Sequence, residues 1–380
     1  MQLSSDWRTN AFTSAAIFST NENNFLSNTD DAYSLDLLEA GVTVTGDIFA
    51  STRLAAQLLS RKVGDVDNGS VRFDFVYIQQ RLFENDSANV SLRLGRVKRP
   101  LGLDSDTREV AFTRSSIISP QGLFYDFARN TVLSQDGGLL AMDWNTAAHH
   151  FTAEFSEAFP RTDSQDLGLI LGFTNPAIAA QKTSGSASSA LSPTVRLSWE
   201  WLDQNMRLVV GEANLYYHYD FDQGSIFHSG DISVYGKTLG LEKSFSSWVF
   251  STEYIDTYLK YKDMPPFPEE LPSFSYYYQA LYHFSSTVYG VVRRENTYEL
   301  KDDRNGKKIA ATLEHTPFAT PAFRYYSNDI MFGLSWQTTK NLLLRAELHF
   351  FNGAAMAQDK AEQETEQNWR LYGLQASLRF

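Results

Sequence analysis

Short segments in which apolar and polar residues alternate recur along the whole chain, and clusters of polar turn residues separate them. Successive side chains of a β-strand point to opposite faces of the sheet, so each segment gives a strand with one apolar and one polar face. In residues 341–352, for example, Leu348 lies on the apolar face, and Arg345, Glu347 and His349 lie on the polar face. The repetition predicts an all-β protein.

The last segment, Trp369–Phe380, alternates strictly and ends on an aromatic residue. Tyr372, Leu374 and Leu378 share one face with Phe380. This ending resembles the final strand of bacterial outer-membrane β-barrels. The resemblance implies that Phe380 lies where the barrel closes and that the protein resides in the bacterial outer membrane, in contact with membrane lipid and lipopolysaccharide.

The number of candidate strands bears on the kind of barrel. Transmembrane barrels of a single bacterial chain have an even number of strands, and the sequence offers one segment too many. The first segment is the weakest because the long polar stretch from Thr20 to Asp31 follows it, so residues 1–32 form either a first strand or a periplasmic segment. We therefore predict a transmembrane antiparallel β-barrel of about sixteen strands, with an aqueous lumen. The candidate segments lie near 5–17, 36–47, 51–62, 69–83, 87–98, 133–145, 147–158, 166–174, 191–203, 205–219, 231–245, 247–262, 273–284, 286–299, 325–337, 341–352 and 368–380.

The connections are expected to alternate in length, with the long ones outside the cell. No interdomain linker stands out, so residues 1–380 are predicted to form a single domain. Tight turns are predicted at Gln204–Asn205, Ser246–Ser247, Ser285–Ser286 and Lys340–Asn341, and long polar loops at 181–189, 261–272, 299–324 and 353–368.

Composition supports a membrane barrel and excludes other classes of protein. Aromatic residues make up 14% of the chain, which would supply the aromatic girdles at the two membrane interfaces. No apolar run approaches the roughly 20 residues of a membrane helix. The net charge of -12 and the lack of a basic stripe exclude nucleic acid as a partner.

The first residues, Met1–Asp6, have neither the basic start nor the apolar stretch of a signal peptide. An outer-membrane protein needs such a peptide for export. We expect that the signal peptide has been removed and that Met1 is an expression start placed before the mature chain; a cytosolic protein is the alternative.

One segment, Arg96–Thr131, breaks the alternation, and it is too long for a hairpin turn. Long structured loops in compact folds usually carry function. The runs Leu94–Leu103 (LGRVKRPLGL) and Phe112–Pro120 (FTRSSIISP) resemble Gram-negative porins related to the phosphate-selective group. The resemblance implies that residues 100–130 fold back into the lumen as a pore-constricting loop, and that the protein forms a homotrimer.

A wide lumen becomes selective only if charged side chains line a constriction. The candidates for the basic side are Arg93, Arg96, Lys98, Arg108, Arg114 and Arg129, and those for the acidic side are Asp104, Asp106, Glu109 and Asp126. Each arginine could instead pair with a carboxylate of the barrel wall and hold the loop down. The chain has 33 Lys plus Arg against 45 Asp plus Glu, so anion selectivity of the phosphate-selective type does not follow.

The histidines, two Asp- and Gly-containing segments and two tyrosine runs could carry other functions, but each has a simpler structural explanation. None of the seven histidines lies in a nucleophile elbow or a zinc-binding pattern, so no catalytic residue and no enzymatic activity are predicted. Asp65–Gly69 and Asp302–Gly306 suit turns better than calcium loops. Tyr216–Tyr219 and Tyr276–Tyr278 could form a sugar-stacking track, but an interfacial girdle explains them more simply.

The sequence therefore predicts an outer-membrane porin, a passive diffusion channel for small hydrophilic solutes or ions, without metal, nucleotide or organic cofactor. The main alternative is a plugged barrel that acts as a partner subunit, surface receptor or adhesion protein through its acidic loops. A soluble all-β carbohydrate-binding protein is a second alternative.

Overall fold

The structure is a computed structural model, and it describes residues 7–64, 66–105, 110–124, 129–162, 184–265, 267–316, 319–357 and 365–380. These residues form β-strands and a few short helices. The strands are β1 (Trp7–Asn21), β2 (Ser34–Phe49), β3 (Thr52–Val63), β4 (Asp67–Glu84), β5 (Ala88–Lys98), β6 (Ser134–Asn145), β7 (His149–Pro160), β8 (Gly185–Ala190), β9 (Ser192–Trp201), β10 (Met206–Phe221), β11 (Gly230–Phe245), β12 (Trp248–Lys262), β13 (Glu270–His283), β14 (Val288–Tyr298), β15 (Tyr326–Gln337), β16 (Leu342–Asn352) and β17 (Asn368–Arg379). The helices are α1 (Gln121–Phe124), α2 (Arg129–Leu133) and α5 (Lys307–Leu313), with 3-10 turns η1 (Ala111–Thr113), η3 (Leu202–Gln204) and η4 (Ala322–Tyr325).

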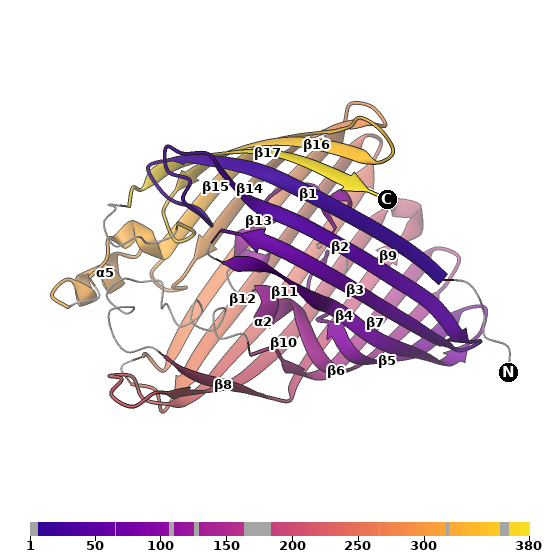
Figure 1. Cartoon of the computed structure of the whole chain (residues 1–380), viewed down its shortest axis with the longest axis horizontal. Coiled ribbons are helices and arrows are strands. Elements are labelled where there is room, and N and C mark those ends of the chain that lie inside the picture. The colour runs from indigo at the N-terminus through magenta and orange to yellow at the C-terminus, as the bar shows by residue number, and fades with distance from the viewer. Residues whose placement is uncertain are drawn as a thin grey trace.

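The strands close into an antiparallel barrel (Figure 1). Each strand pairs with its neighbours in sequence except around β8, where β7 pairs with β9 and β8 pairs with β10, and β1 pairs with both β2 and β17. At the seam the Phe380 amide donates to the Ala11 carbonyl at 2.8 Å, and the Ala11 amide donates to the Phe380 carbonyl at 3.3 Å. Closure leaves no free sheet edge among the described strands, as a lipid environment requires.

The predicted number of strands is confirmed. Strands β8 and β9 both pair with β10 and together occupy one place in the wall, so the seventeen strands of the described residues fill sixteen places. The prediction that the first segment is the weakest was wrong, because β1 is a long strand paired on both sides. The predicted segment 166–174 lies outside the described residues. Residues 185–190, predicted as part of a loop, form β8.

The connections alternate in length as predicted. The start of β1, the end of β17 and the short turns, such as Ser246–Ser247 between β11 and β12, lie at one end of the barrel, and α5 lies at the other (Figure 1). The Asp302–Gly306 segment turns, with the Gly306 amide donating to the Asp303 carbonyl at 2.9 Å. The turn prediction for Asp65–Gly69 was wrong for its second half, because Asn68 and Gly69 belong to β4.

The two faces of the wall differ as the alternation predicts. On β17, Leu374 is 60% exposed on the outer face, whereas its neighbour Gln375 is 4% exposed on the inner face. Outward side chains along the other strands are likewise large and apolar, and many inward ones are charged. This inverts the pattern of a soluble protein and is that of a barrel surrounded by lipid. No helix in the described part of the chain is both long and apolar enough to cross a membrane.

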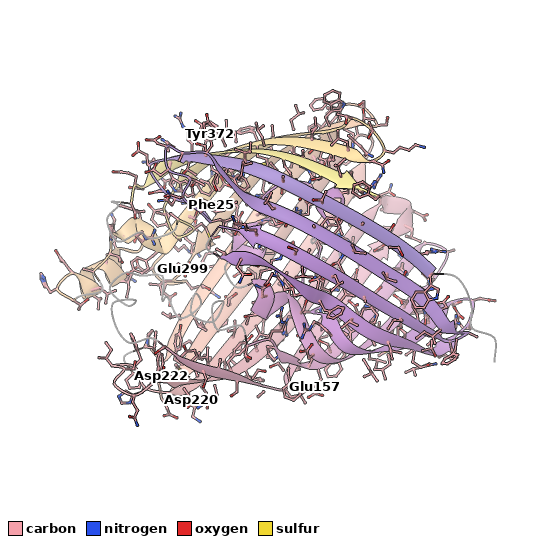
Figure 2. The ribbon with its side chains drawn as sticks, in the orientation of Figure 1. Phe25, Glu157, Asp220, Asp222, Glu299 and Tyr372 are labelled. Carbon is pink, nitrogen blue, oxygen red and sulfur yellow. The ribbon has the colours of Figure 1, made fainter. Side chains whose placement is uncertain are left out.

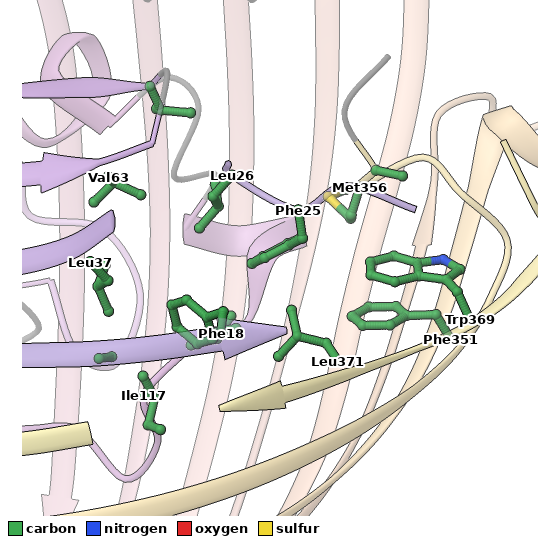
Figure 3. Close-up of a cluster of buried hydrophobic side chains, with 14 of the residues drawn as sticks. Phe18, Phe25, Leu26, Leu37, Val63, Ile117, Phe351, Met356, Trp369 and Leu371 are labelled. Atoms are coloured by element: carbon green, nitrogen blue, oxygen red, sulfur yellow. The ribbon is translucent and has the colours of Figure 1, made fainter. Parts of the chain in front are cut away.

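An apolar cluster lies inside the barrel near the long loops (Figure 3). Its centre is Phe25, from the β1–β2 connection, which packs with Phe351 and Trp369. The rings of Phe351 and Trp369 stack with centroids 3.9 Å apart. Ile117 and Ile118, from the segment between β5 and β6, join the same cluster. The cluster thus ties that segment to the β1, β16 and β17 side of the wall.

Candidate constriction loop in the barrel lumen

The segment between β5 and β6 is described over residues 99–105, 110–124 and 129–133, which lie inside the barrel, and we call this segment the inner loop. Its two ends meet where the Arg99 amide donates to the Leu133 carbonyl at 2.8 Å. Between them it contains η1, α1 and α2, and α2 is visible through the wall in Figure 1. Wall residues from β9, β12, β14 and β16 all contact it, so it extends across the lumen.

Buried wall carboxylates accept hydrogen bonds from backbone amides of the inner loop. Glu253 of β12 accepts from the Leu103 amide at 2.7 Å, and Glu295 of β14 accepts from the Gly122 amide at 2.6 Å. Glu347 of β16 accepts from the amides of Ile117 and Ile118, the second at 3.2 Å.

Buried wall arginines bind the carbonyls and hydroxyls of the same loop. Arg196 donates to the Ser105 hydroxyl at 2.6 Å. Arg293 donates to the Ile118 carbonyl at 2.9 Å, and Arg345 donates to the Ala111 carbonyl at 2.7 Å and to the Arg114 carbonyl. An irregular backbone away from water needs such partners. The charged side chains on the inner face of the wall therefore fix the conformation of the loop.

The inner loop also contributes charge of its own. The carboxylate of Glu39, on β2, lies 2.7 Å from Arg114 and 3.6 Å from Arg129, both in the loop, and 3.1 Å from Arg61 of β3. All four side chains are buried. One carboxylate thus faces three guanidinium groups, two of them from the inner loop.

Buried carboxylates also lie on other parts of the wall. His349 lies between Asp329 of β15, at 2.7 Å, and Glu347, at 3.4 Å, all buried. Glu253 is also buried and accepts from the Tyr277 hydroxyl at 3.0 Å. Glu253, on β12, lies about half the circumference away from Glu39 on β2, whereas β15 and β16 are only three or four strands from β2.

Comparison with known proteins adds to this geometry. No family model matches the chain, and no curated protein matches it in sequence. Among solved structures, an anion-selective porin from Comamonas acidovorans matches with a TM-score of 0.61 at 15% identity, over 99% of this chain and 99% of its own. The chain has the porin fold.

Two further porin-fold matches extend over the whole barrel. OmpT of Vibrio cholerae, in its trimer form, gives a TM-score of 0.59 at 9% identity over 99% of each chain. OmpF of Salmonella typhi, in complex with daunomycin, gives 0.57 at 10% identity over 98% of this chain and 97% of its own. At such identities the likeness concerns the fold, and it confirms the predicted transmembrane β-barrel. The predicted outer-membrane location agrees with these neighbours.

Within this porin fold, the three basic candidates of β5 lie in different places. Arg93 donates to Gln79 at 3.3 Å and faces the Tyr77 ring, on the inner face. Lys98 is buried and lies 2.5 Å from Asp74. Arg96 shares the outer face of β5 with the exposed Leu94 and pairs with Asp136 of β6 at 2.7 Å. Arg96 is therefore separated from the charges that hold the inner loop.

The candidates within the inner loop are only partly described. Arg114 and Arg129 meet at Glu39, and Asp104 lies 3.5 Å from Arg207 of β10. The remaining candidates, Asp106, Arg108, Glu109 and Asp126, lie outside the described residues.

The wall residues that hold the loop were absent from the candidate set. Arg345, Glu347 and His349 appear in the sequence only as the polar face of one strand. One signal could have found them: charged residues recur on the strand face that points away from lipid. A charge that faces the lumen beside a structured loop needs a partner, and the loop can supply it. The girdle interpretation was wrong for Tyr217 and Tyr219, because both are buried on the inner face of the wall.

Glu299, at the end of β14 on the long-loop side, gives a prediction about pH (Figure 2). Burial raises the pKa of Glu299 from 4.5 to about 7, although the charge of Arg324 lowers it. The folded protein therefore holds a proton that the unfolded chain releases, and folding loses stability as the pH rises from about 4.5 through about 7. Relative to Glu299→Gln, wild-type protein should lose at most about 3 kcal/mol over this range.

The measurement is urea unfolding of both proteins in detergent at several pH values between about 4.5 and about 8. Other titrating groups are common to the two proteins and cancel in the difference. A difference in unfolding free energy that stays constant with pH would rule out this role for Glu299.

Proposed function

We propose that the protein is an outer-membrane porin, a channel through which small hydrophilic solutes or ions diffuse passively past the inner loop. The single observation that carries this proposal is the position of the loop. It lies within the lumen of a closed barrel and is held there by buried charges from β9, β12, β14 and β16. A wide barrel needs such a constriction to discriminate among solutes.

In this proposal the constriction is lined by charges of both signs. Arg114 and Arg129, with Arg61 from the wall, form its basic side around Glu39. The proposal also keeps Arg93, Lys98 and Asp104 as constriction residues, with Asp104 beside Arg207 of β10. The proposal keeps Asp106, Arg108, Glu109 and Asp126 as further constriction residues because they belong to the inner loop. A transverse field between the basic and acidic sides would orient polar solutes as they pass.

The assembly and surroundings follow from the same proposal. The apolar outer face suits membrane lipid, with lipopolysaccharide around the long loops. OmpT of Vibrio cholerae, which shares the fold, has a trimer form, and we propose a homotrimer of single-domain barrels here. Kinship with the phosphate-selective group is also a proposal, and it rests on the runs Leu94–Leu103 and Phe112–Pro120.

The test is single-channel recording of the purified protein in a planar bilayer under a salt gradient. Stepwise openings in groups of three are expected for a trimer, and the sign of the reversal potential reports which charges dominate the constriction. Folded protein that produces no steps would refute the channel.

One observation favours a plugged barrel as a second candidate. The apolar cluster around Phe25 fills part of the lumen close to its mouth. A barrel closed in this way would serve as a receptor or partner subunit through its long loops. Silence in the bilayer from folded protein would favour this candidate.

A further inference from the structure

A cavity of about 220 Å³ lies between the inner loop and the wall formed by β10 to β14. Its wall is mostly apolar, and polar groups occur at a few positions. The apolar side chains around it include Leu101, Leu215, Val234, Ile255, Leu259 and Met356.

This sector of the inner face departs from the rest of the lumen. Inward positions of β2, β3, β14 and β16 carry charged residues such as Glu39, Arg61 and Arg345. The inward positions of β10, β11 and β12 beside the cavity carry Leu215, Val234 and other aliphatic residues instead. Apolar side chains facing a lumen favour a solute with an apolar part.

Arg99, at the start of the inner loop, contributes a charge to the same cavity. It is only 2% exposed. Its Nε donates to the Val132 carbonyl at 2.8 Å and its Nη1 donates to the Thr194 hydroxyl at 3.0 Å. In the described part of the chain, Nη2 has no hydrogen-bond partner, and no carboxylate forms an ion pair with Arg99.

A buried guanidinium without a counter-ion is costly, and an anionic ligand would remove the cost. Burial lowers the pKa of Arg99 only to about 10, so the group stays charged at neutral pH. A carboxylate is the small anion whose geometry suits a guanidinium, and a single free nitrogen is enough to hold one of its oxygens.

We propose that this cavity is a binding site for a small monocarboxylate with an apolar body, whose carboxylate accepts a hydrogen bond from Arg99 Nη2. A dry cavity of about 150 Å³ lined by aliphatic and aromatic residues holds benzene. The cavity here is larger, at about 220 Å³, and so has room for a ring with a carboxylate. The site rests on the proposed function, because such an acid would reach it as a solute passing through the channel.

Benzoate is the probe, and acetate is the matched anion without the apolar body. Calorimetric titration of the folded protein in detergent near pH 6 keeps Glu299, which also lines the cavity, largely neutral. Benzoate should bind roughly tenfold or more tightly than acetate, since only its ring fills the apolar cavity.

Two variants separate the charge from the cavity. Arg99→Met removes the guanidinium and keeps a long side chain. Gly236→Leu fills the cavity from β11, where a Cβ would meet only Ile255 Cδ1, at 3.8 Å. Each should weaken benzoate binding roughly tenfold or more. Gly138→Leu, on the outer face of β6 where a Cβ comes no closer than 3.4 Å to Leu94, is the control and should bind like wild type.

Benzoate binding that is absent, no stronger than acetate binding, or unchanged in both variants would overturn the proposal. Channel recordings without benzoate keep this outcome distinct from failure of the porin proposal. A conducting protein that does not bind benzoate refutes only the site, and a silent protein that binds benzoate in the predicted pattern refutes only the channel.

Discussion

Replacing Glu39 with Gln is expected to destabilise the folded barrel by about 3–5 kcal/mol. The Glu39 carboxylate is the shared counter-ion of Arg61, Arg114 and Arg129, at 3.1, 2.7 and 3.6 Å. Gln keeps the shape of the side chain but removes its charge, so each of the three buried guanidinium groups loses its ion pair with Glu39. Because two of these arginines belong to the inner loop, the loop should also lose its attachment to β2.

The loss is measured as the change in free energy of unfolding in urea, with the protein in detergent micelles. Glu270→Gln is the matched control, since Glu270 pairs with Lys260 at 3.4 Å on a largely exposed surface. That variant should lose no more than about 1 kcal/mol. Similar losses in the two variants would show that the Glu39 cluster is not electrostatically important.

A second substitution tests the cause. Adding Arg114→Met to Glu39→Gln removes a guanidinium group that has lost its ion pair with Glu39. The loss of unfolding free energy in the double variant should therefore be smaller than the sum of the losses in the two single variants. Strict additivity of the two losses would contradict the shared counter-ion.

The barrel was predictable because its signal is local. In Leu342–Asn352 and Asn368–Arg379, the alternation of side chains fixes which residues face lipid, and the structure keeps that assignment. The pattern can be recognised within each strand alone. It also fixes the register of pairing, because a one-residue shift would turn every apolar side chain toward the lumen. The error over the first strand arose because a polar stretch after β1 looked like a loop, although it packs through Phe25 into the apolar cluster.

The charges that hold the inner loop were not predictable in the same way. Glu39 and Arg114 are 75 residues apart, and Arg345 and Ala111 are 234 apart, so their contacts depend on closure of the whole barrel. The loop itself was identifiable from its broken alternation and from a motif resemblance. Its partners were not, since any inward charge on sixteen strands could have met it.

Single-residue geometry also limited the predictions for β5. Arg93 and Arg96 look alike in sequence, but they have opposite parity along the strand, so only Arg93 faces the lumen. Lys98 reaches Asp74 because the pairing of β3 with β4 shifts register beside Asp74, which changes the direction of the Asp74 side chain. Such a shift depends on the pairing of two strands and has no clear signature in either sequence alone.

Releasing the inner loop from β16 should have the second largest effect, and it separates two causes of the loop's position. Arg345→Met removes the donors to the Ala111 and Arg114 carbonyls, and Glu347→Gln removes the charge that binds the amides of Ile117 and Ile118. Each lost hydrogen bond to a charged group costs about 1.5–3 kcal/mol, so amide hydrogen exchange across 111–118 should speed up roughly 10- to 100-fold in each variant.

The control is Arg53→Met, because Arg53 pairs with Asp47 at 2.7 Å on an exposed surface away from the loop. Exchange across 111–118 should be unchanged in this variant. If exchange is also unchanged in Arg345→Met and Glu347→Gln, the apolar packing of Ile117 and Ile118 holds the loop without help from the charges. If exchange speeds up as expected, the charges of the wall hold the inner loop in place and thereby set the width of the lumen. The same variants should then have a larger single-channel conductance than wild type in a bilayer. Packing alone would position the loop tip at one side of the barrel, whereas the charges fix it from four strands.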